Sequence, residues 1–285
     1  MPSWYHEDQS KGLRLSFEIK KRLVSKKTKY QVIDIFDSVG HGKVMALDKK
    51  IMVTEKDEFV YHEMISNIPF FSHKRPKRVL VIGGGDGGTV RELVKHKDLE
   101  QIDLCEIDGE VISLSKKHLK FTSNKLGEKR VTVYVEDGFK FLQDPKRKKY
   151  YDLILVDSTD PIGMAAKLFE KSFFDLVKDC LHKDGIVAGQ CESPFYFEDT
   201  IRETNQVLNR TFKHVKFFTA PIITYPSGYW SFFIASDKRI RLCKKKIDLD
   251  NLKLMYFNFD IYHSAFGLPN FYQNILKGRP SDLPF

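Results

Sequence analysis

Acidic side chains in the middle of the chain are the residues best suited to do chemistry. Asp157 and Asp160 stand three residues apart, and Asp86 lies inside the glycine-rich run from Gly83 to Gly88. A carboxylate attracts a cation, and it can also take a proton from an ammonium group and leave a nucleophilic amine. A phosphate beside Asp86 would be repelled, which counts against a dinucleotide. The pattern therefore favours a cationic ligand that carries an amine.

The glycine-rich run can be interpreted in three ways. The spacing Gly83-x-Gly85-x-x-Gly88 fits a dinucleotide-binding turn, and Gly83-x-Gly85-x-Gly87 fits a turn that binds an S-adenosyl ligand. Glycines let the backbone turn tightly and come close to a ligand. A purely structural turn is the third interpretation, and the run alone does not choose among them.

Acidic residues also follow the next two predicted strands. Glu106 ends one of them, 21 residues after Gly85, where it could accept hydrogen bonds from both ribose hydroxyls of a nucleoside. Asp137 follows the other, where it could accept a hydrogen bond from an adenine amino group. In open α/β sheets, ligands bind at the carboxyl ends of the strands. These two acids, together with Gly83 and Asp157, follow four successive strands, which predicts a nucleoside site.

Strand and helix patterns alternate from residue 61 to residue 235, and the elements they predict must position these acids. Such alternation predicts a mostly parallel sheet with helices on both faces, here closed by a final antiparallel pair. The first helix is expected to end at Pro69, because proline lacks a backbone N–H. We expect strands at 78–82, 101–107, 131–135, 151–156, 185–189, 215–218 and 229–235, and helices at 61–68, from the glycine run to 96, and at 109–120, 171–180 and 198–209.

Residues 1 to about 60 have a different pattern. Apolar and polar residues alternate with period two over 13–19, and residues 30–36 are rich in β-forming types. This predicts a small N-terminal antiparallel β-domain at 1–60, followed by a catalytic domain with a C-terminal tail at 61–285. The tail after Asn251 ends in a proline-rich segment, and we expect it to pack on the outside of the catalytic domain.

Length and composition exclude several classes of protein. The chain has 285 residues, of which 42% are hydrophobic and 30% charged, which fits a globular protein and excludes collagen-like, coiled-coil and disordered chains. No apolar run approaches the ~20 residues of a membrane helix, and the start lacks the order of a signal peptide, so we expect a cytoplasmic protein without a membrane partner.

The net charge of +9 comes from short, separate basic groups, so we expect no nucleic-acid partner. The four cysteines form no closely spaced pair, and no cluster of metal ligands is visible.

The chain resembles the spermidine synthases, a family of polyamine aminopropyltransferases, over nearly its whole length. No matching segment is specific by itself, but the combination is. The segments are Trp4-Tyr5, Tyr30-Gln31, Asp57-Glu58-Phe59, Tyr61-His62-Glu63-Met64, the run from Val81 to Gly88, Glu106-Ile107-Asp108, Asp137-Gly138, the run from Asp157 to Pro161, Gly189-Gln190, the run from Tyr225 to Gly228 and the run from Ala265 to Pro269.

This resemblance implies a fold and a reaction. The fold would be α/β and Rossmann-like, of the class I methyltransferase type, with a mixed, mostly parallel sheet and a small N-terminal antiparallel β-domain. The reaction would move an aminopropyl group from decarboxylated S-adenosylmethionine to putrescine, which gives spermidine and 5′-methylthioadenosine. The donor would be a co-substrate, with no tightly bound cofactor and no metal. Members are usually homodimers or homotetramers joined through the N-terminal β-domain, and we expect the same here.

The resemblance also implies roles for individual residues. Asp157 would be the base that deprotonates the acceptor amine, Asp86 would bind the amine of the donor, and Asp160 could anchor the far ammonium of the diamine. The charge of Asp86 would repel the carboxylate of ordinary S-adenosylmethionine and so select the decarboxylated donor. The polyamine and aminopropyl site would also include Tyr61, His62 and Tyr225, and the donor nucleoside site would comprise Gln31, Gly83, Gly85, Glu106, Asp137, Gly138 and Met164.

Two positions depart from the family pattern, and three alternatives stay open. Met164 stands where the family usually has proline, in the loop over the adenine, and Met52 stands where it commonly has glutamine. One alternative is amine N-methylation, as by a putrescine N-methyltransferase, although such an enzyme must tolerate the donor carboxylate near Asp86. Another is aminopropyl transfer to cadaverine, agmatine or spermidine. The third is an RNA-binding or RNA-modifying protein that uses the positive charge.

Overall fold

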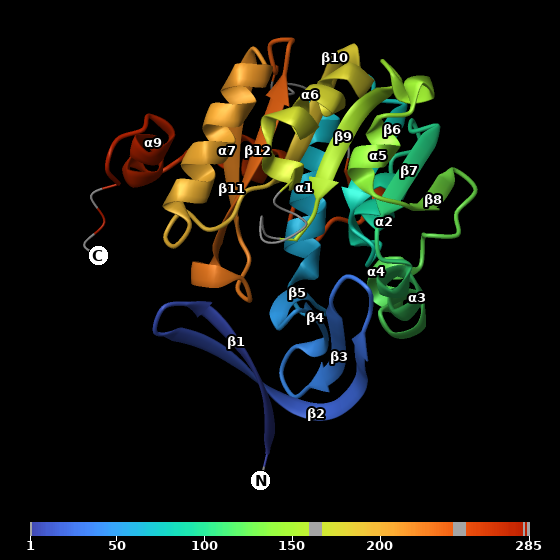
Figure 1. Cartoon of the computed structure of the whole chain (residues 1–285), viewed down its shortest axis with the longest axis vertical. Helices are drawn as coiled ribbons and strands as arrows, with labels where there is room; N and C mark the ends of the chain where they lie inside the picture. The colour runs from blue at the N-terminus through green and yellow to red at the C-terminus, as the bar shows by residue number, and fades with distance from the viewer. Residues whose placement is uncertain (1, 160–166, 242–248, 282, 284–285) are drawn as a thin grey trace.

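The computed structural model of the chain describes residues 2–159, 167–241, 249–281 and 283. Two β-sheets follow one another along the long axis of the molecule, and most helices gather around the second sheet (Figure 1). The chain begins in the first sheet, at the opposite end of the molecule from most of the second (Figure 1).

The first sheet is antiparallel and has five strands in the order β1-β2-β3-β4-β5. Successive side chains point to opposite faces, as a period of two requires. In β1, Tyr5, Glu7 and Gln9 are buried, whereas the residues between them are exposed. The predicted N-terminal antiparallel sheet is confirmed. Its strands are β1 Ser3–Ser10, β2 Leu13–Lys27, β3 Val32–Ser38, β4 Gly42–Leu47 and β5 Lys50–Thr54.

The second sheet is mixed and has seven strands in the order β11-β12-β10-β9-β6-β7-β8. Neighbouring strands from β10 to β8 are parallel, whereas β12 is antiparallel to both of its neighbours. The predicted mostly parallel sheet with a final antiparallel pair is therefore confirmed. Its strands are β6 Arg78–Gly83, β7 Gln101–Glu106, β8 Val131–Val135, β9 Tyr151–Asp157, β10 Leu181–Gln190, β11 His214–Pro221 and β12 Tyr229–Ser236.

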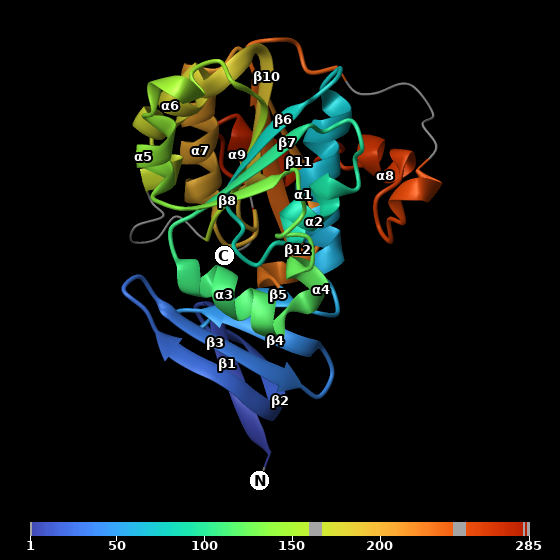
Figure 2. The same cartoon turned by 90° about the vertical axis from the view of Figure 1, so that its right-hand side faces the viewer.

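Helices cover both faces of the second sheet (Figure 2). The helices are α1 Glu58–Ser72, α2 Gly88–Val94, α3 Gly109–His118, α4 Lys120–Ser123, α5 Gly138–Leu142, α6 Lys171–Cys180, α7 Glu198–Thr211, α8 Phe259–Ser264 and α9 Asn270–Leu276, with short 3-10 helices η1 Pro145–Arg147, η3 Pro226–Gly228 and η4 Asp250–Leu252. Val79 and Val81 of β6 lie in a core with α1 and α2, whereas Leu80 and Ile82 lie in a second core with α5, α6 and α7. None of the helices in the described ranges is long and apolar enough to cross a membrane.

The helices α3 and α4 lie between the two sheets and pack on the N-terminal sheet (Figure 2). Ile33 and Ile35 of β3 share a small core with Val111 of α3 and with Leu119, which separates α3 from α4. Because α3 begins three residues after the end of β7, this packing holds the carboxyl end of β7 next to the N-terminal sheet.

The helices predicted over 61–68 and 109–120 differ most from the observed ones. α1 does not end before Pro69 but continues to Ser72, because a proline in the last turn removes only one helical hydrogen bond and Phe71 beyond it is buried. The same helix begins at Glu58, earlier than expected. The helix predicted over 109–120 is broken at Leu119, whose non-helical backbone lets its side chain reach the core between the sheets. The short α5 was not predicted.

The C-terminal tail is more deeply integrated than the sequence suggests. Tyr262 of α8 and Tyr272 of α9 are fully buried, one in each of the two cores of the second sheet. The carboxylate of Glu63 in α1 accepts three backbone N–H groups from residues 255–257 at 2.8 to 2.9 Å. The tail therefore completes both cores and fixes one face of α1, instead of only covering the outside.

Candidate active site

The glycine run forms a tight turn against the end of β9. Gly83 and Gly84 have φ values of 81° and 65°, a region that other residues rarely adopt. A Cβ at Gly83 would collide with the carbonyl oxygen of Asp157, and the N–H of Gly84 donates to that oxygen at 2.7 Å. The run therefore needs glycine for its shape, and the turn brings Asp86 close to Asp157.

Glu106 lies at the end of β7, directly beside the glycine run. A Cβ at Gly85 would lie 2.8 Å from Cγ of Glu106, so only glycine lets the carboxylate approach the turn. Burial raises the pKa of Glu106 to about 7, although the N–H of Asp108 donates to Oε1 at 2.9 Å and favours the ionised form. The position suits an acid that accepts hydrogen bonds from hydroxyl groups of a ligand.

Three more residues predicted for nucleoside binding lie near this end of the sheet. Asp137 caps α5 by accepting a backbone N–H at 2.8 Å, so its carboxylate has a fixed orientation. Gly138 is buried, and a Cβ there would lie 2.7 Å from an isoleucine of β6. Gln31 comes from the loop before β3 in the N-terminal sheet and donates to Oδ2 of Asp108 at 3.1 Å. The structure thus brings residues of both sheets together.

Asp108 was not predicted as a site residue. It accepts the hydroxyl of Thr28 at 2.7 Å in addition to the amide of Gln31, and its other oxygen caps α3 by accepting the N–H of Glu110 at 3.1 Å. An open cleft beside it is lined by residues from both sheets, among them Tyr30. Asp108 stands just before a predicted helix and two residues after Glu106. An N-cap residue is expected there, and this could have pointed to Asp108.

Asp157 is the last residue of β9, and two hydroxyl groups hold it. Tyr61 donates to Oδ1 at 2.7 Å, and Thr89 donates to Oδ2 at 2.6 Å. Partial burial raises the pKa of Asp157, and the nearby carboxylate of Asp86 raises it further. Such a carboxylate is a stronger base than one in water, and both of its oxygens are fixed. The sequence predicts Tyr61 and Asp157 as site residues but not the contact between them, and it does not predict Thr89.

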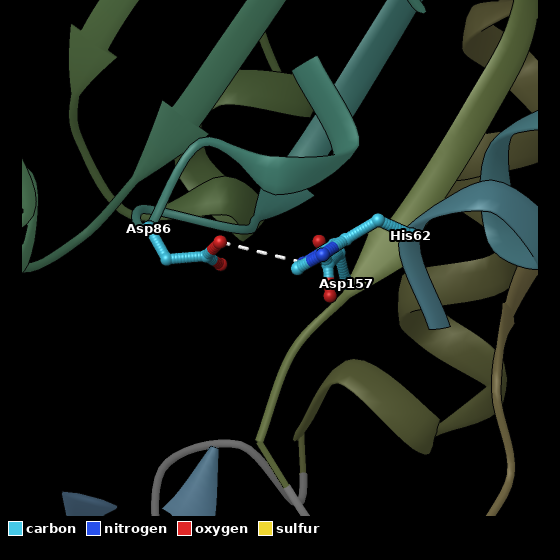
Figure 3. A group of neighbouring side chains, drawn as sticks. All are labelled: His62, Asp86 and Asp157. Carbon is cyan, nitrogen blue, oxygen red and sulfur yellow. Dashed lines mark ion pairs between the residues drawn. The ribbon is translucent and has the colours of Figure 1, made fainter. Parts of the chain in front are cut away.

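His62 lies next to Asp157 and pairs with Asp86 (Figure 3), and its other ring nitrogen faces Glu58. Its Nδ1 is 2.5 Å from Oε2 of Glu58, and its Nε2 is 3.3 Å from Oδ1 of Asp86. Burial alone would lower the pKa of His62, but Asp86 and Glu58 outweigh that effect and raise it to about 10. The imidazole is therefore a cation at neutral pH, and it balances part of the negative charge of the site.

No cluster of metal ligands is visible in the sequence, but the fold assembles one group of possible ligands. His62, Asp86 and Asp157 each offer a ligand atom, and these atoms lie within 4.8 Å of one another (Figure 3). The fold brings them together from α1, the glycine run and β9, which no spacing in the sequence reveals. Both ring nitrogens of His62 already face carboxylates, and a protonated imidazole has no lone pair for a metal. The donor set therefore fits an ion-pair network better than a metal ion.

A narrow cavity leads from Tyr61 toward the N-terminal sheet. Tyr61 and Tyr225 pack edge to face with their ring centroids 5.9 Å apart, and Trp230 packs on Tyr225 at 4.8 Å. The hydroxyl of Tyr225 donates to the carbonyl oxygen of Met52 at 2.6 Å, which ties this aromatic wall to β5. Aromatic faces of this kind suit an alkyl chain or a cation.

Glu7 of β1 lines the same cavity and was missed by the sequence analysis. Only 3% of it is exposed, Gln9 donates to its Oε2 at 3.4 Å, and Nζ of Lys50 lies 3.9 Å from its Oε1. Glu7 could have been noticed, because alternate side chains of a strand point to the same face, so Glu7 lies on the same face as Tyr5. An acid on a buried face is unusual. The sequence did not reveal that this face meets the second sheet.

Two of the predicted site residues, Asp160 and Met164, lie outside the described residues. The other predicted residues lie in two places. Those predicted to bind the nucleoside lie near the ends of β6, β7 and β8, namely Gln31, Gly83, Gly85, Glu106, Asp137 and Gly138. Those predicted to bind the amines lie around α1, the glycine run and β9, namely Tyr61, His62, Asp86, Asp157 and Tyr225.

Comparison with known proteins gives consistent matches over nearly the whole chain. Residues 58–246 match the spermine/spermidine synthase domain, and residues 3–55 match the spermidine synthase tetramerisation domain. The polyamine aminopropyltransferase of Shouchella clausii is 40% identical over 277 residues, which cover 97% of this chain and 100% of that protein. The corresponding protein of Caldicellulosiruptor saccharolyticus is 42% identical over 280 residues, with 97% and 99% covered. A crystal structure of spermidine synthase in complex with the transition-state analogue AdoDATO superimposes with a TM-score of 0.92 at 36% identity and covers 97% of each chain.

Proposed function

Because this chain belongs to the spermine/spermidine synthase family, we propose that putrescine is the acceptor of the aminopropyl group that it transfers from decarboxylated S-adenosylmethionine. The products are then spermidine and 5′-methylthioadenosine, and the donor is a co-substrate. Amine N-methylation is not favoured, since the matched relatives are named aminopropyltransferases. The absence of a nucleic-acid partner and the cytoplasmic location stay predictions.

The donor nucleoside would bind at the ends of β6, β7 and β8. Glu106 would accept the ribose hydroxyls, and Asp137 would accept the adenine amino group, with Gly138 allowing the base to come close. Gly83 and Gly85 would let the turn pass beside the donor, and Gln31 would close the site from the N-terminal sheet. Support comes from the closeness of these residues and from the fixed orientations of both carboxylates. Met164 would contribute from the loop over the adenine.

Asp157 would act as the base. The ammonium of the acceptor gives its proton to the carboxylate, and the freed amine attacks the propyl carbon next to the sulfonium. A C–N bond forms while the C–S bond breaks, and the bonding pair stays on sulfur, which leaves as a neutral thioether. The raised pKa and the two hydroxyl groups that hold both oxygens support this role. Holding the amine in line with the carbon would supply much of the rate.

Asp86 would bind the free amine of the donor and so select the decarboxylated form. In ordinary S-adenosylmethionine a carboxylate lies close to that amine, and Asp86 would repel it by an amount on the order of a few kcal/mol where water is excluded. His62 holds one oxygen of Asp86 and the N–H of Gly88 donates to the same oxygen at 2.9 Å, so the carboxylate has a defined direction.

The single observation that carries the choice of acceptor is a cavity beside Asp157 that is lined by a second, buried carboxylate. Glu7, Tyr61, Tyr225 and Trp230 line this cavity, and Tyr61 also donates to Asp157. A diamine has two ammonium groups joined by an alkyl chain, which suits two carboxylates and an aromatic wall. Glu7 would hold the far ammonium, a role that the sequence assigned to Asp160.

Replacing Glu7 tests this assignment. We expect Glu7→Gln to raise the KM for putrescine roughly 10- to 100-fold, because a hydrogen bond to a buried charge contributes about 1.5–3 kcal/mol, with little change in the KM for the donor. Asp8→Asn is the matched control, since Asp8 is the next residue of β1 but points outward and pairs with the exposed Arg14. An unchanged KM for putrescine, or equal losses for both substrates, would remove Glu7 from the acceptor site.

We also propose that copies of the chain join through the N-terminal β-domain as a homodimer or homotetramer. The match of residues 3–55 to a tetramerisation domain supports this, and so do the exposed apolar side chains of Trp4 and Leu13 on the first two strands. The division into an N-terminal domain at 1–60 and a catalytic domain at 61–285 is part of the same proposal.

A further inference from the structure

A buried series of alternating charges leads from α2 through α1 to Asp86. Arg91 of α2 contacts Glu58 of α1 with both terminal nitrogens, Nη1 to Oε1 at 2.7 Å and Nη2 to Oε2 at 3.0 Å. Its Nε donates to Glu92 at 2.9 Å, and Lys95 pairs with Glu92 at 2.6 Å. Glu58 in turn holds Nδ1 of His62. The proposed reaction uses Asp86 but gives no role to the charges behind His62.

The position of the His62 ring is tightly constrained. A Cβ on Gly88, the first residue of α2, would collide with the ring, so the imidazole lies directly on the backbone of that helix. Glu58 and Asp86 face opposite sides of the ring, and ionised carboxylates only accept hydrogen bonds. Both ring nitrogens must therefore carry hydrogen. His62 and Arg91 hold the pKa of Glu58 at about 2 despite its burial, which keeps this acceptor ionised.

We propose that Glu58 and Arg91 are positioning residues that keep His62 as an imidazolium, and that this fixed charge lets Asp157 be ionised beside the carboxylate of Asp86. The proposal rests on the roles of Asp86 and Asp157 proposed above. The nearby carboxylate of Asp86 disfavours ionisation of Asp157, and the cationic His62 beside both offsets that effect. Arg91 balances Glu58, so that Glu58 can hold the proton of His62 without adding a net negative charge to the site.

Several charged or titratable groups face this centre. Within the described residues they come from five segments, namely Glu58 and Tyr61 of α1, Asp86 of the glycine run, Arg91 and Glu92 of α2, Glu106 of β7 and Asp157 of β9. The nearest cations are Arg91 and His62, with Lys95 one contact further out on Glu92, and of these three only His62 contacts Asp86. Loss of the proton on His62 would leave the two acids uncompensated.

The first test is the pH profile of Glu58→Gln. We expect loss of the Glu58 carboxylate to lower the pKa of His62, so that less of the imidazole is protonated. The pKa of Asp157 then rises, and the base stays protonated up to a higher pH. We expect the acid limb of kcat/KM for putrescine to move up by at least about one pH unit, with activity recovering at high pH. Glu198→Gln is the matched control, because Glu198 is also paired with an arginine but lies in α7. Its acid limb should coincide with that of the unchanged enzyme, and an unmoved limb in Glu58→Gln would overturn the proposal.

A double variant separates this role from a merely structural one. If Glu58 acts through the charge of His62, the acid limb of Glu58→Gln, His62→Gln should coincide with that of His62→Gln alone. A further shift in the double variant would show that Glu58 acts by another route. A structural role would lower the melting temperature without moving the limb.

A spectroscopic measurement on the unchanged full-length chain keeps the proposal testable even if Glu58→Gln does not fold. The 15N chemical shifts of labelled histidine, assigned with His62→Gln, report whether each ring nitrogen carries hydrogen. We expect His62 to be an imidazolium from pH 6 to about pH 8, well below its pKa. A neutral ring at pH 7 would overturn the proposal. Because this readout needs no substrate, it is independent of whether Asp157 is the base.

Discussion

Asp157 receives hydrogen bonds on both carboxylate oxygens, from Tyr61 and Thr89, and its acidic neighbour Asp86 is paired with His62. The sequence could single out the two aspartates because both follow buried strands, and strand ends are places where sheets bind ligands. Their partners could not be predicted in the same way. Glu58 and His62 are four residues apart on one helix, but the helix was expected to begin at 61, which left Glu58 outside it.

At this scale, Asp157→Asn is the most informative substitution. Asparagine keeps the size of the side chain and can still accept from Tyr61, but it cannot take a proton. We expect turnover to fall roughly 10²- to 10⁴-fold, the usual contribution of a general base, with the melting temperature changed little. Release of methylthioadenosine under saturating substrates measures this, and near-normal turnover would exclude Asp157 as the base.

At the scale of elements, one aspartate connects three segments near the cavity that Glu7 and Tyr225 line. Asp57, just before α1, accepts the hydroxyl of Thr54 at 2.6 Å through Oδ1 and both the N–H and the hydroxyl of Thr224 through Oδ2, at 3.1 and 2.7 Å. Gln9 of β1 donates to the carbonyl of Thr224 at 3.0 Å. These contacts dock the loop that carries Tyr225 on the N-terminal sheet. They join residues up to 215 positions apart in the sequence, so local patterns that predict strands and helices could not predict them.

We therefore expect Asp57→Asn to loosen this loop and weaken acceptor binding. Loss of charge-assisted hydrogen bonds should raise the KM for putrescine roughly tenfold, with a smaller effect on the KM for the donor. Asp48→Asn is the control, because Asp48 also accepts a backbone N–H in the N-terminal sheet, from Val32 at 2.8 Å, but lies away from the loop. Equal changes in the two variants would contradict a specific role for Asp57.

For the whole molecule, the main point is that neither sheet forms the site alone. The second sheet supplies the acids at its strand ends, whereas the first supplies Glu7, Gln31 and the carbonyl of Met52. Local pattern and family resemblance were sufficient for the class of fold, and they placed most of these acids next to strand ends, where the structure has them. They were insufficient for Glu7 and for the ion pairs behind His62, because both depend on how distant segments meet.

The most direct test of the account is a product assay by mass spectrometry. The purified chain is mixed with putrescine, cadaverine, agmatine or spermidine, each with either decarboxylated or ordinary S-adenosylmethionine. We predict an aminopropyl adduct together with methylthioadenosine, formed only with the decarboxylated donor and most efficiently with putrescine. A different preferred acceptor would contradict the proposed fit of the cavity to putrescine. A methylated amine formed with the ordinary donor, or no product with any pair, would contradict the central claim.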